Sequence, residues 1–392
     1  MAVLLSIFHL LVMIASQPSF PLDLTRNKFA VIGASSLGSI ILLSVSFFRR
    51  PSYELFLRTH QALAALAAYS IWRHLPSDKA FPRVYLYISA GLFLFLCIGQ
   101  GCVVVRRNGL FRYGSARDHI THEHGAVRVR IQLQKSLEIK AGQAINLWMW
   151  IPSVSFWSFL ESHPFVVISW AEQPHGHLDL FIEPRRGLTR ELLHYAKSGH
   201  AMNPWVLFSG PHGKRIPIDD SENILIVTSG FGVAAHLPYL KQLIHGYNAR
   251  EVRARRIHLV WQVRNLEPDV TIAAQPLLNG ALNEDTLDDG WILAISIYYE
   301  SSDIGEISFG KRAKIYPGKA PLRQILQAEV AGDHIEKKLV GDIDWATRAR
   351  VEGELKTVKV SGNDKIRDEL RSIVRGHLTD GVSFFELDYE PS

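Results

Sequence analysis

Residues 84–105 contain no charged side chain. A run of this length can cross a bilayer, which takes about 20 apolar residues. Residues 106–392 have the mixed polar and apolar composition of an ordinary globular sequence. The sequence therefore predicts membrane segments followed by a globular part.

Three apolar runs are long enough to be membrane spans, namely Phe29–Phe48, Tyr53–Leu75 and Val84–Val105. A fourth apolar run, Met1–Ile14, is shorter. It is either a signal peptide or part of a membrane helix that begins before Met1. No basic stretch precedes its apolar residues, which favours the membrane helix.

Composition excludes several classes of protein. With 47% hydrophobic and 21% charged residues, the chain is not disordered. Its two cysteines, Cys97 and Cys102, both lie in the third apolar run, which excludes a disulfide framework and a zinc site made of cysteines alone. The net charge of +5 is scattered rather than gathered in long basic tracts, so we expect no nucleic-acid partner.

The second apolar run contains two histidines, His60 and His74. In a helix, fourteen residues come within about 40° of four full turns, so both imidazoles share one face, about 21 Å apart along the axis. Ionisable side chains in a membrane helix usually mark function, and this spacing suits axial ligation of two stacked haems. The alternative is that both are interfacial histidines that reach towards water.

Two other groups of histidines have simpler interpretations. His9 is alone in its apolar segment, where a histidine is more often a core residue than a ligand. The stretch HITHEHG (119–125) has three histidines at spacings that could suit a metal. We interpret it as a solvated polar loop that enters a strand.

After Tyr113 the pattern changes to short alternating strands, which predict a small antiparallel β-barrel that ends near Pro217. The predicted strands are 127–133, 144–151, 165–170 and 178–184.

From residue 223 onwards, strands alternate with helices, which predicts a parallel sheet. A strand at 224–228 leads through Gly230 and Gly232 into a helix from about Ala234 to Ile244. Such a turn can receive a pyrophosphate, although it can also be a tight turn without a ligand. Further strands are predicted at 255–264, 291–299 and 357–362, with loop insertions at 266–290 and 333–356.

In the predicted barrel, several stretches resemble the fungal ferric reductase transmembrane family, which is related to NADPH oxidases. SHPFVVISW resembles its flavin-binding motif, with Val166 where the family usually has threonine. RRGLTREL resembles the stretch near the flavin pyrophosphate, and GPHG resembles the turn that closes the flavin domain. The flavin-binding residues implied by this resemblance are His163, Pro164, Phe165, Val166, Ser169, Arg185, Arg186, Gly187, Leu188, Thr189 and Gly210.

The C-terminal part resembles the same family. SGFGVAAHLPYL resembles its NADPH-binding turn and LVWQVR its next strand. VSGNDKIRDELRSIV resembles the segment near the nicotinamide, with Ser361 and Asn363 where cysteine and proline are common. The resemblance implies nucleotide binding by Gly230, Gly232, Val233, Trp261, Arg264 and Gly362, with Ser361 and the C-terminal aromatic residue Tyr389 as catalytic residues.

The second apolar run resembles the family's fifth membrane helix, which carries two haem-ligating histidines. This implies that His60 and His74 bind haem b. His9 matches one histidine of the pair on the family's third helix, and the other would precede Met1. The implied outer haem lies between His9 and His74, and the inner haem keeps only His60.

The resemblance implies three domains: a partial helical transmembrane haem domain (1–112), a FAD-binding β-barrel (113–218) and an NADPH-binding α/β domain (219–392), the last two forming a ferredoxin-reductase-like module. It implies electron transfer from cytosolic NADPH through FAD and haem b to ferric or cupric chelates. The chain would be a multi-pass protein of the plasma membrane with a cytosolic C-terminal domain. A superoxide-producing oxidase, a haem-poor flavin diaphorase and a degenerate, non-catalytic membrane subunit remain as alternatives.

Overall fold

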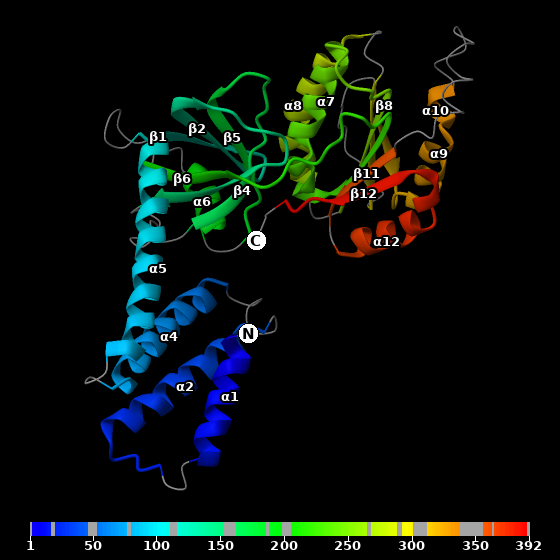
Figure 1. Cartoon of the computed structure of the whole chain (residues 1–392). Coiled ribbons are helices and arrows are strands. Elements are labelled where there is room, and N and C mark those ends of the chain that lie inside the picture. Colours follow the sequence, from blue (N-terminus) through cyan, green and yellow to red (C-terminus); the bar gives the residue numbers. More distant parts are fainter. Residues whose placement is uncertain are drawn as a thin grey trace. The chain divides into compact units, whose positions relative to one another are not determined.

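The computed structural model is shown in Figure 1. It describes residues 2–16, 20–45, 53–76, 80–109, 116–151, 162–185, 188–197, 205–264, 268–287, 292–300, 312–336, 356–362 and 364–389. These residues form two compact units, Met1–Cys102 and Val103–Ser392.

The first unit is helical. Its helices are α1 (Ala2–Ser16), α2 (Thr25–Leu43), α4 (Tyr53–His74) and most of α5 (Ala80–Arg107), which continues into the second unit. All four lie where the apolar runs predict them. Among the described residues, only the segment Phe81–Arg107 is both long and apolar enough to cross a membrane by length and composition.

Helices α2 and α4 pack closely through small side chains. Gly33 and Ser36 of α2 are buried, as are Ala67 and Ser70 of α4. A Cβ atom added to Gly33 would lie 3.3 Å from the Cβ of Ser70, so a larger residue there would push the helices apart. Close backbone approach through small residues is typical of helix pairs in membranes.

The second unit begins with a six-stranded antiparallel barrel. Its strands are β1 (Ala116–Glu123), β2 (Ala126–Leu137), β3 (Ala144–Trp150), β4 (Ser162–Val166), β5 (His175–Ile182) and β6 (Trp205–His212), in the order β4-β3-β6-β1-β2-β5. A bridge between Val167 and Leu180 joins the two ends of this order. Helix α6 (Leu188–Lys197) follows β5. The interpretation of HITHEHG as a loop is wrong, because residues 119–123 pair with β2 and only the turn at His124 and Gly125 is irregular.

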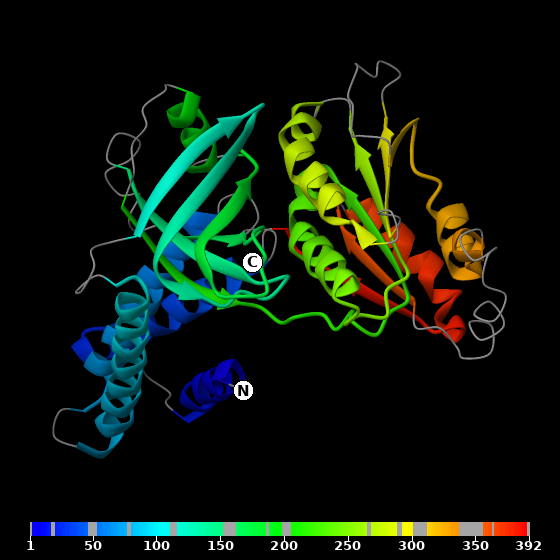
Figure 2. The same ribbon diagram turned by 90° about the horizontal axis from the view of Figure 1, so that it is seen from above.

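A six-stranded parallel sheet follows, as the alternation of strands and helices predicts. Its strands are β7 (Asn223–Ser229), β8 (Arg256–Val263), β9 (Leu293–Tyr299), β10 (Ala313–Pro317), β11 (Lys356–Ser361) and β12 (Val382–Glu386), in the order β10-β9-β8-β7-β11-β12. Helices α7 (Leu237–Asn248) and α8 (Pro268–Glu284) cover one face, and α9 (Leu322–Ala331) and α12 (Asp364–Arg375) cover the other (Figure 2).

Several local predictions in this region are wrong. The helix expected from Ala234 begins instead as a 3₁₀ helix, η2 (Gly230–Ala235), and α7 starts at Leu237. Most of 266–290 is helix α8, and 333–336 is the short helix α10 (Asp333–Glu336), so neither is a loop insertion there; residues 337–355 lie outside the described part. The sequence analysis also missed β10, α9, the short helix η4 (Leu378–Asp380) and β12.

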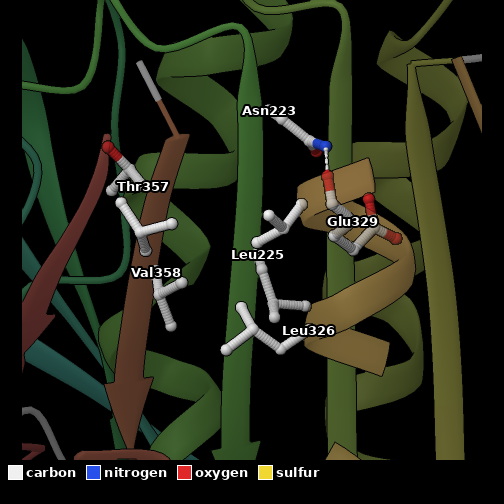
Figure 3. Close-up of a pocket in the computed structure, with 8 residues that line it drawn as sticks. Asn223, Leu225, Leu326, Glu329, Thr357 and Val358 are labelled. Atoms are coloured by element: carbon white, nitrogen blue, oxygen red, sulfur yellow. Dashed lines mark hydrogen bonds between the residues drawn. The ribbon is translucent and has the colours of Figure 1, made fainter. Parts of the chain in front are cut away.

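A buried ionic network anchors α9 to the sheet through Glu329, whose contact with Asn223 is drawn in Figure 3. The carboxylate of Glu329 accepts hydrogen bonds from Arg256 at 2.8–3.0 Å and lies 2.7 Å from Nδ1 of His258. Nε2 of His258 lies 2.8 Å from Oγ of Ser296, and Asn223 donates to the main-chain oxygen of Glu329. Glu329 thereby binds α9 to β7 and β8, and His258 extends the network to β9.

Candidate nucleotide-binding cleft

A cleft of about 380 Å³ opens at the carboxyl ends of β7 and β11. These strands are neighbours, but the chain leaves β7 towards β8 on one side and reaches β11 only later on the other. In open α/β sheets, ligands bind at such a point where the strand order reverses. The cleft is lined by Glu183, Arg185, Ser229, Gly230, Phe231, Gly232, Arg264, Ser361, Gly362, Arg367, Leu387, Asp388 and Tyr389.

Three glycines allow the turn after β7 to lie against the end of β11. Gly230 has a φ of +50°, which favours glycine. A Cβ atom on Gly232 would lie 2.5 Å from the main-chain oxygen of Ser361, and one on Gly362 would lie 2.9 Å from Oγ of Ser229. The glycines therefore bring two segments of backbone together at the floor of the cleft.

Three arginines line the cleft, and they differ in how their charge is balanced. Arg185 forms an ion pair with Glu183 at 2.8 Å. Arg367 lies within 4.0 Å of the carboxylates of Asp364, Glu386 and Asp388. Arg264 is exposed, and no hydrogen bond or ion pair joins it to another described residue. It is the cleft arginine most available to an anionic ligand.

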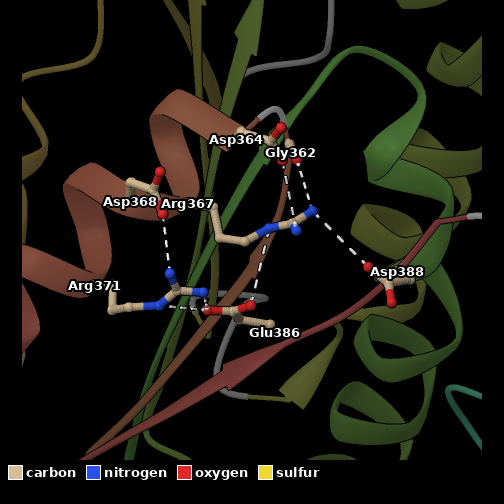
Figure 4. A network of polar contacts seen from close by, with 7 residues as sticks. All are labelled: Gly362, Asp364, Arg367, Asp368, Arg371, Glu386 and Asp388. Atoms are coloured by element: carbon tan, nitrogen blue, oxygen red, sulfur yellow. Dashed lines mark hydrogen bonds and ion pairs between the residues drawn. The ribbon is translucent and has the colours of Figure 1, made fainter. Parts of the chain in front are cut away.

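Helix α12 holds the C-terminal segment beside the cleft (Figure 4). Arg371 contacts Glu386 and Asp368, and Arg367 donates to the main-chain oxygen of Gly362 at 3.3 Å. These contacts position residues 387–389, which form one wall of the cleft.

Tyr389 joins this C-terminal wall to the barrel. Its hydroxyl donates to the main-chain oxygen of Phe181 at 3.0 Å and accepts from the N–H of Glu183 at 2.8 Å. The ring of Phe231, between the two glycines of the turn, stacks on Phe181 with centroids 5.2 Å apart, and lies 6.3 Å from the ring of Tyr389. Three aromatic rings from distant parts of the sequence therefore meet at the cleft.

The structure brings seven of the predicted site residues together in this cleft. They are Arg185, Gly230, Gly232, Arg264, Ser361, Gly362 and Tyr389. Val233 and Trp261 are buried beside it instead, and the indole N–H of Trp261 donates to the main-chain oxygen of Gly230 at 3.0 Å. Sequence analysis missed Glu183, Ser229, Phe231, Arg367, Leu387 and Asp388. Phe231 could have been found from its place between two glycines.

The predicted flavin-binding residues form a second group in the barrel. His163, Pro164, Phe165 and Val166 lie on β4, where the last two side chains are buried. Oγ of Ser169 accepts from the N–H of Asp179, and Oγ1 of Thr189 accepts from the N–H of Arg185. Gly210 has a φ of +119° at the end of β6. Arg186, Gly187 and Asn363 lie outside the described residues, as does the side chain of Leu188.

The predicted haem-binding histidines lie in the helical unit. Nδ1 of His74 is 3.1 Å from the main-chain oxygen of Arg26. Donation to that carbonyl leaves Nε2 with a lone pair, which is the arrangement common in metal-binding histidines. Nδ1 of His60 is buried and has no hydrogen-bond partner in the described part of the chain, whereas His9 is exposed. No group of three or more metal-binding side chains occurs among the described residues.

Behind the glycine turn lies a group of buried basic side chains that no motif predicts. His236 and Lys359 are fully buried, and their side-chain nitrogens have no hydrogen-bond partner within the described ranges. The Lys359 amine lies 3.1 Å from the ring centroid of Tyr239. Burial, together with the charge of Lys359, lowers the pKa of His236 to about 3. Burial also lowers the pKa of Lys359 well below its usual value.

Replacing this buried amine with an apolar side chain is expected to stabilise the protein. In the unfolded chain Lys359 is protonated below about pH 10.5, whereas in the folded state its pKa is lowered. The cost of this lysine to the free energy of unfolding therefore grows as the pH falls below about 10.5. Lys359→Met should therefore increase the free energy of unfolding by about 1–3 kcal/mol at neutral pH. Thermal unfolding in detergent measures this, with the exposed Lys365→Met as control. An unchanged or lower melting temperature would contradict it.

Three regions of the chain match known protein families. Residues 118–216 match the FAD-binding domain family, 221–303 match the ferric reductase NAD binding domain, and 1–71 match the ferric reductase like transmembrane component. With the antiparallel barrel and the parallel sheet, these matches define a flavin- and nicotinamide-nucleotide-binding oxidoreductase module preceded by a helical region, and they confirm the predicted fold class.

The chain is similar in sequence to the ferric reductase transmembrane components of several fungi. It is 25% identical over 255 residues to ferric/cupric reductase transmembrane component 2 of Saccharomyces cerevisiae, covering 64% of this chain and 33% of that protein. It is 27% identical to component 5 of the same yeast, covering 67% and 36%. The chain thus spans about a third of the length of these relatives. Among solved structures, a ferredoxin NADP+ reductase from Neisseria gonorrhoeae with bound FAD and NADP aligns with 69% of this chain and 97% of its own, at 16% identity and a TM-score of 0.44.

Proposed function

We propose that this chain carries electrons from NADPH through FAD and haem b to ferric or cupric chelates. The observation that supports this best is the cleft at β7 and β11, where glycines let two backbone segments meet beside an arginine without a partner among the described residues. The names of the homologous ferric and cupric reductases support metal chelates as electron acceptors.

The cleft residues have separable roles in this proposal. The main-chain N–H groups of the turn at Gly230 and Gly232 receive the nucleotide pyrophosphate, because the first N–H groups of a helix such as η2 have no partner within the helix itself. Arg264 binds a further phosphate, which favours NADPH over NADH. Ser361 forms the floor beside the nicotinamide, and Tyr389 fixes the wall through its two hydrogen bonds to β5.

The residues on β4 fit a flavin. His163, Pro164 and Phe165 lie on one strand of the barrel. Thr189 is the second residue of α6, the helix that follows β5, and N–H groups at a helix start favour an anionic pyrophosphate. When bound, FAD accepts two electrons from the nicotinamide and can release them singly. The chain's own contribution is to hold the two ligand sites in one compact unit.

The histidines of α4 fit the proposed haem sites. The hydrogen bond from His74 to Arg26 orients that ring, and the Nδ1 atom of His60 is buried without a hydrogen-bond partner among the described residues. When bound, haem b carries single electrons. We further propose that α5 spans the plasma membrane and that the second unit lies in the cytosol.

Measuring haem and flavin together in the purified full-length chain distinguishes this proposal from its alternatives. The reduced-minus-oxidised difference spectrum quantifies haem, and the flavin is quantified in the same sample. Flavin that is reduced by NADPH, followed by haem reduction, supports the proposal. Flavin without haem would indicate a diaphorase, neither cofactor would indicate a non-catalytic subunit, and superoxide in place of chelate reduction would indicate an oxidase.

Replacing Arg264 tests the choice of nucleotide. Arg264→Gln should weaken NADPH binding by about ten- to a hundredfold, because it removes a charge-assisted contact worth about 1.5–3 kcal/mol, while NADH binding changes little. Titration of each nucleotide gives the two Kd values, with the exposed Arg253→Gln as control. An equal loss for both nucleotides would show that Arg264 does not recognise the additional phosphate.

A further inference from the structure

An apolar patch lies on the outer face of the barrel, on the adjacent strands β3 and β6. Its members are Trp148 and Trp150 of β3 and Trp205 and Leu207 of β6. The alternate residues on these strands, among them Leu147, Met149, Val206 and Phe208, point inwards and are fully buried. The patch residues therefore occupy positions where the outside of a barrel is ordinarily polar.

The patch is compact and open. Trp148 pairs in register with Leu207, and Trp150 pairs with Trp205. The rings of Trp150 and Trp205 meet edge to face with centroids 6.4 Å apart, yet these residues are 44% and 62% exposed. Two paired tryptophans this exposed are a feature of surfaces that contact a partner or a membrane.

The strand β6 is fixed to the end of α5. Asn108 directly follows the last residue of that helix, Arg107. Its side chain donates to the main-chain oxygen of Phe208 at 2.8 Å and accepts from the N–H of Phe208 at 3.1 Å. Leu207 is the next residue along β6, and Trp205 lies three residues away, or about 10 Å along the strand.

The end of α5 has the character of a membrane boundary. Arg106 and Arg107 follow its uncharged run, and basic residues at the end of a span lie at the level of the lipid headgroups. The Asn108 contacts keep the patch within about 10 Å of that level, which is comparable to the thickness of the headgroup layer. Tryptophan prefers this layer, because its ring is apolar and its N–H still finds a polar partner.

We propose that Trp148, Trp150, Trp205 and Leu207 rest in the headgroup layer of the bilayer that α5 leaves. The partner is a lipid surface, and the barrel is bound to it at two places, the helix end and the patch. This inference rests on the part of the proposed function in which α5 crosses a membrane.

Lipid quenching of a fluorophore attached at single cysteines tests the proposal. The full chain, with Cys97→Ala and Cys102→Ala, is reconstituted in vesicles of phosphatidylcholine and phosphatidylserine with or without brominated acyl chains. An environment-sensitive dye is attached in turn at Trp205→Cys, Trp150→Cys, His177→Cys and Leu92→Cys. His177 is exposed on β5, three strands from β6 in either direction round the barrel, and Leu92 is 60% exposed in the middle of α5.

Quenching at positions 205 and 150 and at 92, with none at 177, is the expected result. Quenching at position 92 alone would overturn the patch proposal but leave the membrane span of α5 intact. No quenching at position 92 would overturn the membrane span, and the patch proposal with it. A dye at 205 that is shielded from water, is not quenched by lipid and becomes exposed on dilution of the protein would show that a second copy covers the patch.

Discussion

Glu329→Gln should destabilise the protein by about 3–5 kcal/mol, because removing one member of a buried ionic network leaves the others uncompensated. Glu329 is 4% exposed, and its carboxylate is the common partner of Arg256 and His258. The amide oxygen in the variant can still accept hydrogen bonds, but the amide carries no charge to balance the guanidinium. The melting temperature in detergent measures the effect.

The pH dependence of the same variant separates charge from packing. Burial alone would raise the pKa of Glu329, but the hydrogen bonds and charges of His258 and Arg256 lower it to about 2. Because the folded pKa is below the unfolded one, this stabilisation is present above about pH 4.5 and is lost as the pH falls towards 2. Between about pH 4.5 and 2, the free energy of unfolding should therefore decline much less in Glu329→Gln than the decline seen in the wild type. The exposed Glu369→Gln should retain it, and identical curves for wild type and Glu329→Gln would refute the assignment.

Gly232→Ala should greatly reduce nucleotide binding, because the added methyl group meets backbone rather than a movable side chain. Its Cβ would lie 2.5 Å from the main-chain oxygen of Ser361 and 2.9 Å from Oγ1 of Thr228. Either the turn or the end of β11 must shift, which costs about 1–3 kcal/mol and widens the floor of the cleft. We expect the Kd for NADPH to rise by about tenfold or more.

Gly280→Ala provides a matched control for this substitution. Gly280 lies inside α8, and a Cβ there would meet nothing within 4 Å. Alanine should stabilise that helix by about 1 kcal/mol and leave nucleotide binding unchanged. If Gly232→Ala bound NADPH as tightly as Gly280→Ala, the turn would not be the nucleotide site.

The sequence was most informative where one pattern decides the structure. Alternation with period two located the barrel strands around Val127–Leu133 and Ala144–Ile151, because one face of each strand is buried. The glycine turn was found because Gly230 and Gly232 are needed for a close backbone approach. The cleft itself could not be foreseen in full, since Glu183, Arg367 and Tyr389 meet only after the sheet and barrel have formed.

The wrong predictions arose where a polar or turn-rich composition was interpreted as a loop. Residues 266–290 are rich in turn formers and acidic residues, yet α8 forms there because Val270, Ala273, Ala274 and Leu278 pack against the sheet. Strand β10 is short and mostly exposed, so its pattern is weak. The histidines of 119–125 are polar, but main-chain pairing with β2 requires no apolar side chain on the outer face.

The number of hydrogen bonds between neighbouring strands differs around the barrel. Between β4 and β5 the closure of the barrel depends on the bridge of Val167 with Leu180, on one main-chain hydrogen bond from Ile168 to Asp179, and on the return contact from the Asp179 N–H to Ser169. The paired strands β1 and β2 share a register of seven residue pairs. Local opening follows lines of few hydrogen bonds, so amide protons along this seam should exchange earlier than those between β1 and β2. A ligand bound to β4 would therefore stabilise the closure of the barrel. Its binding should slow amide hydrogen exchange along the seam between β4 and β5.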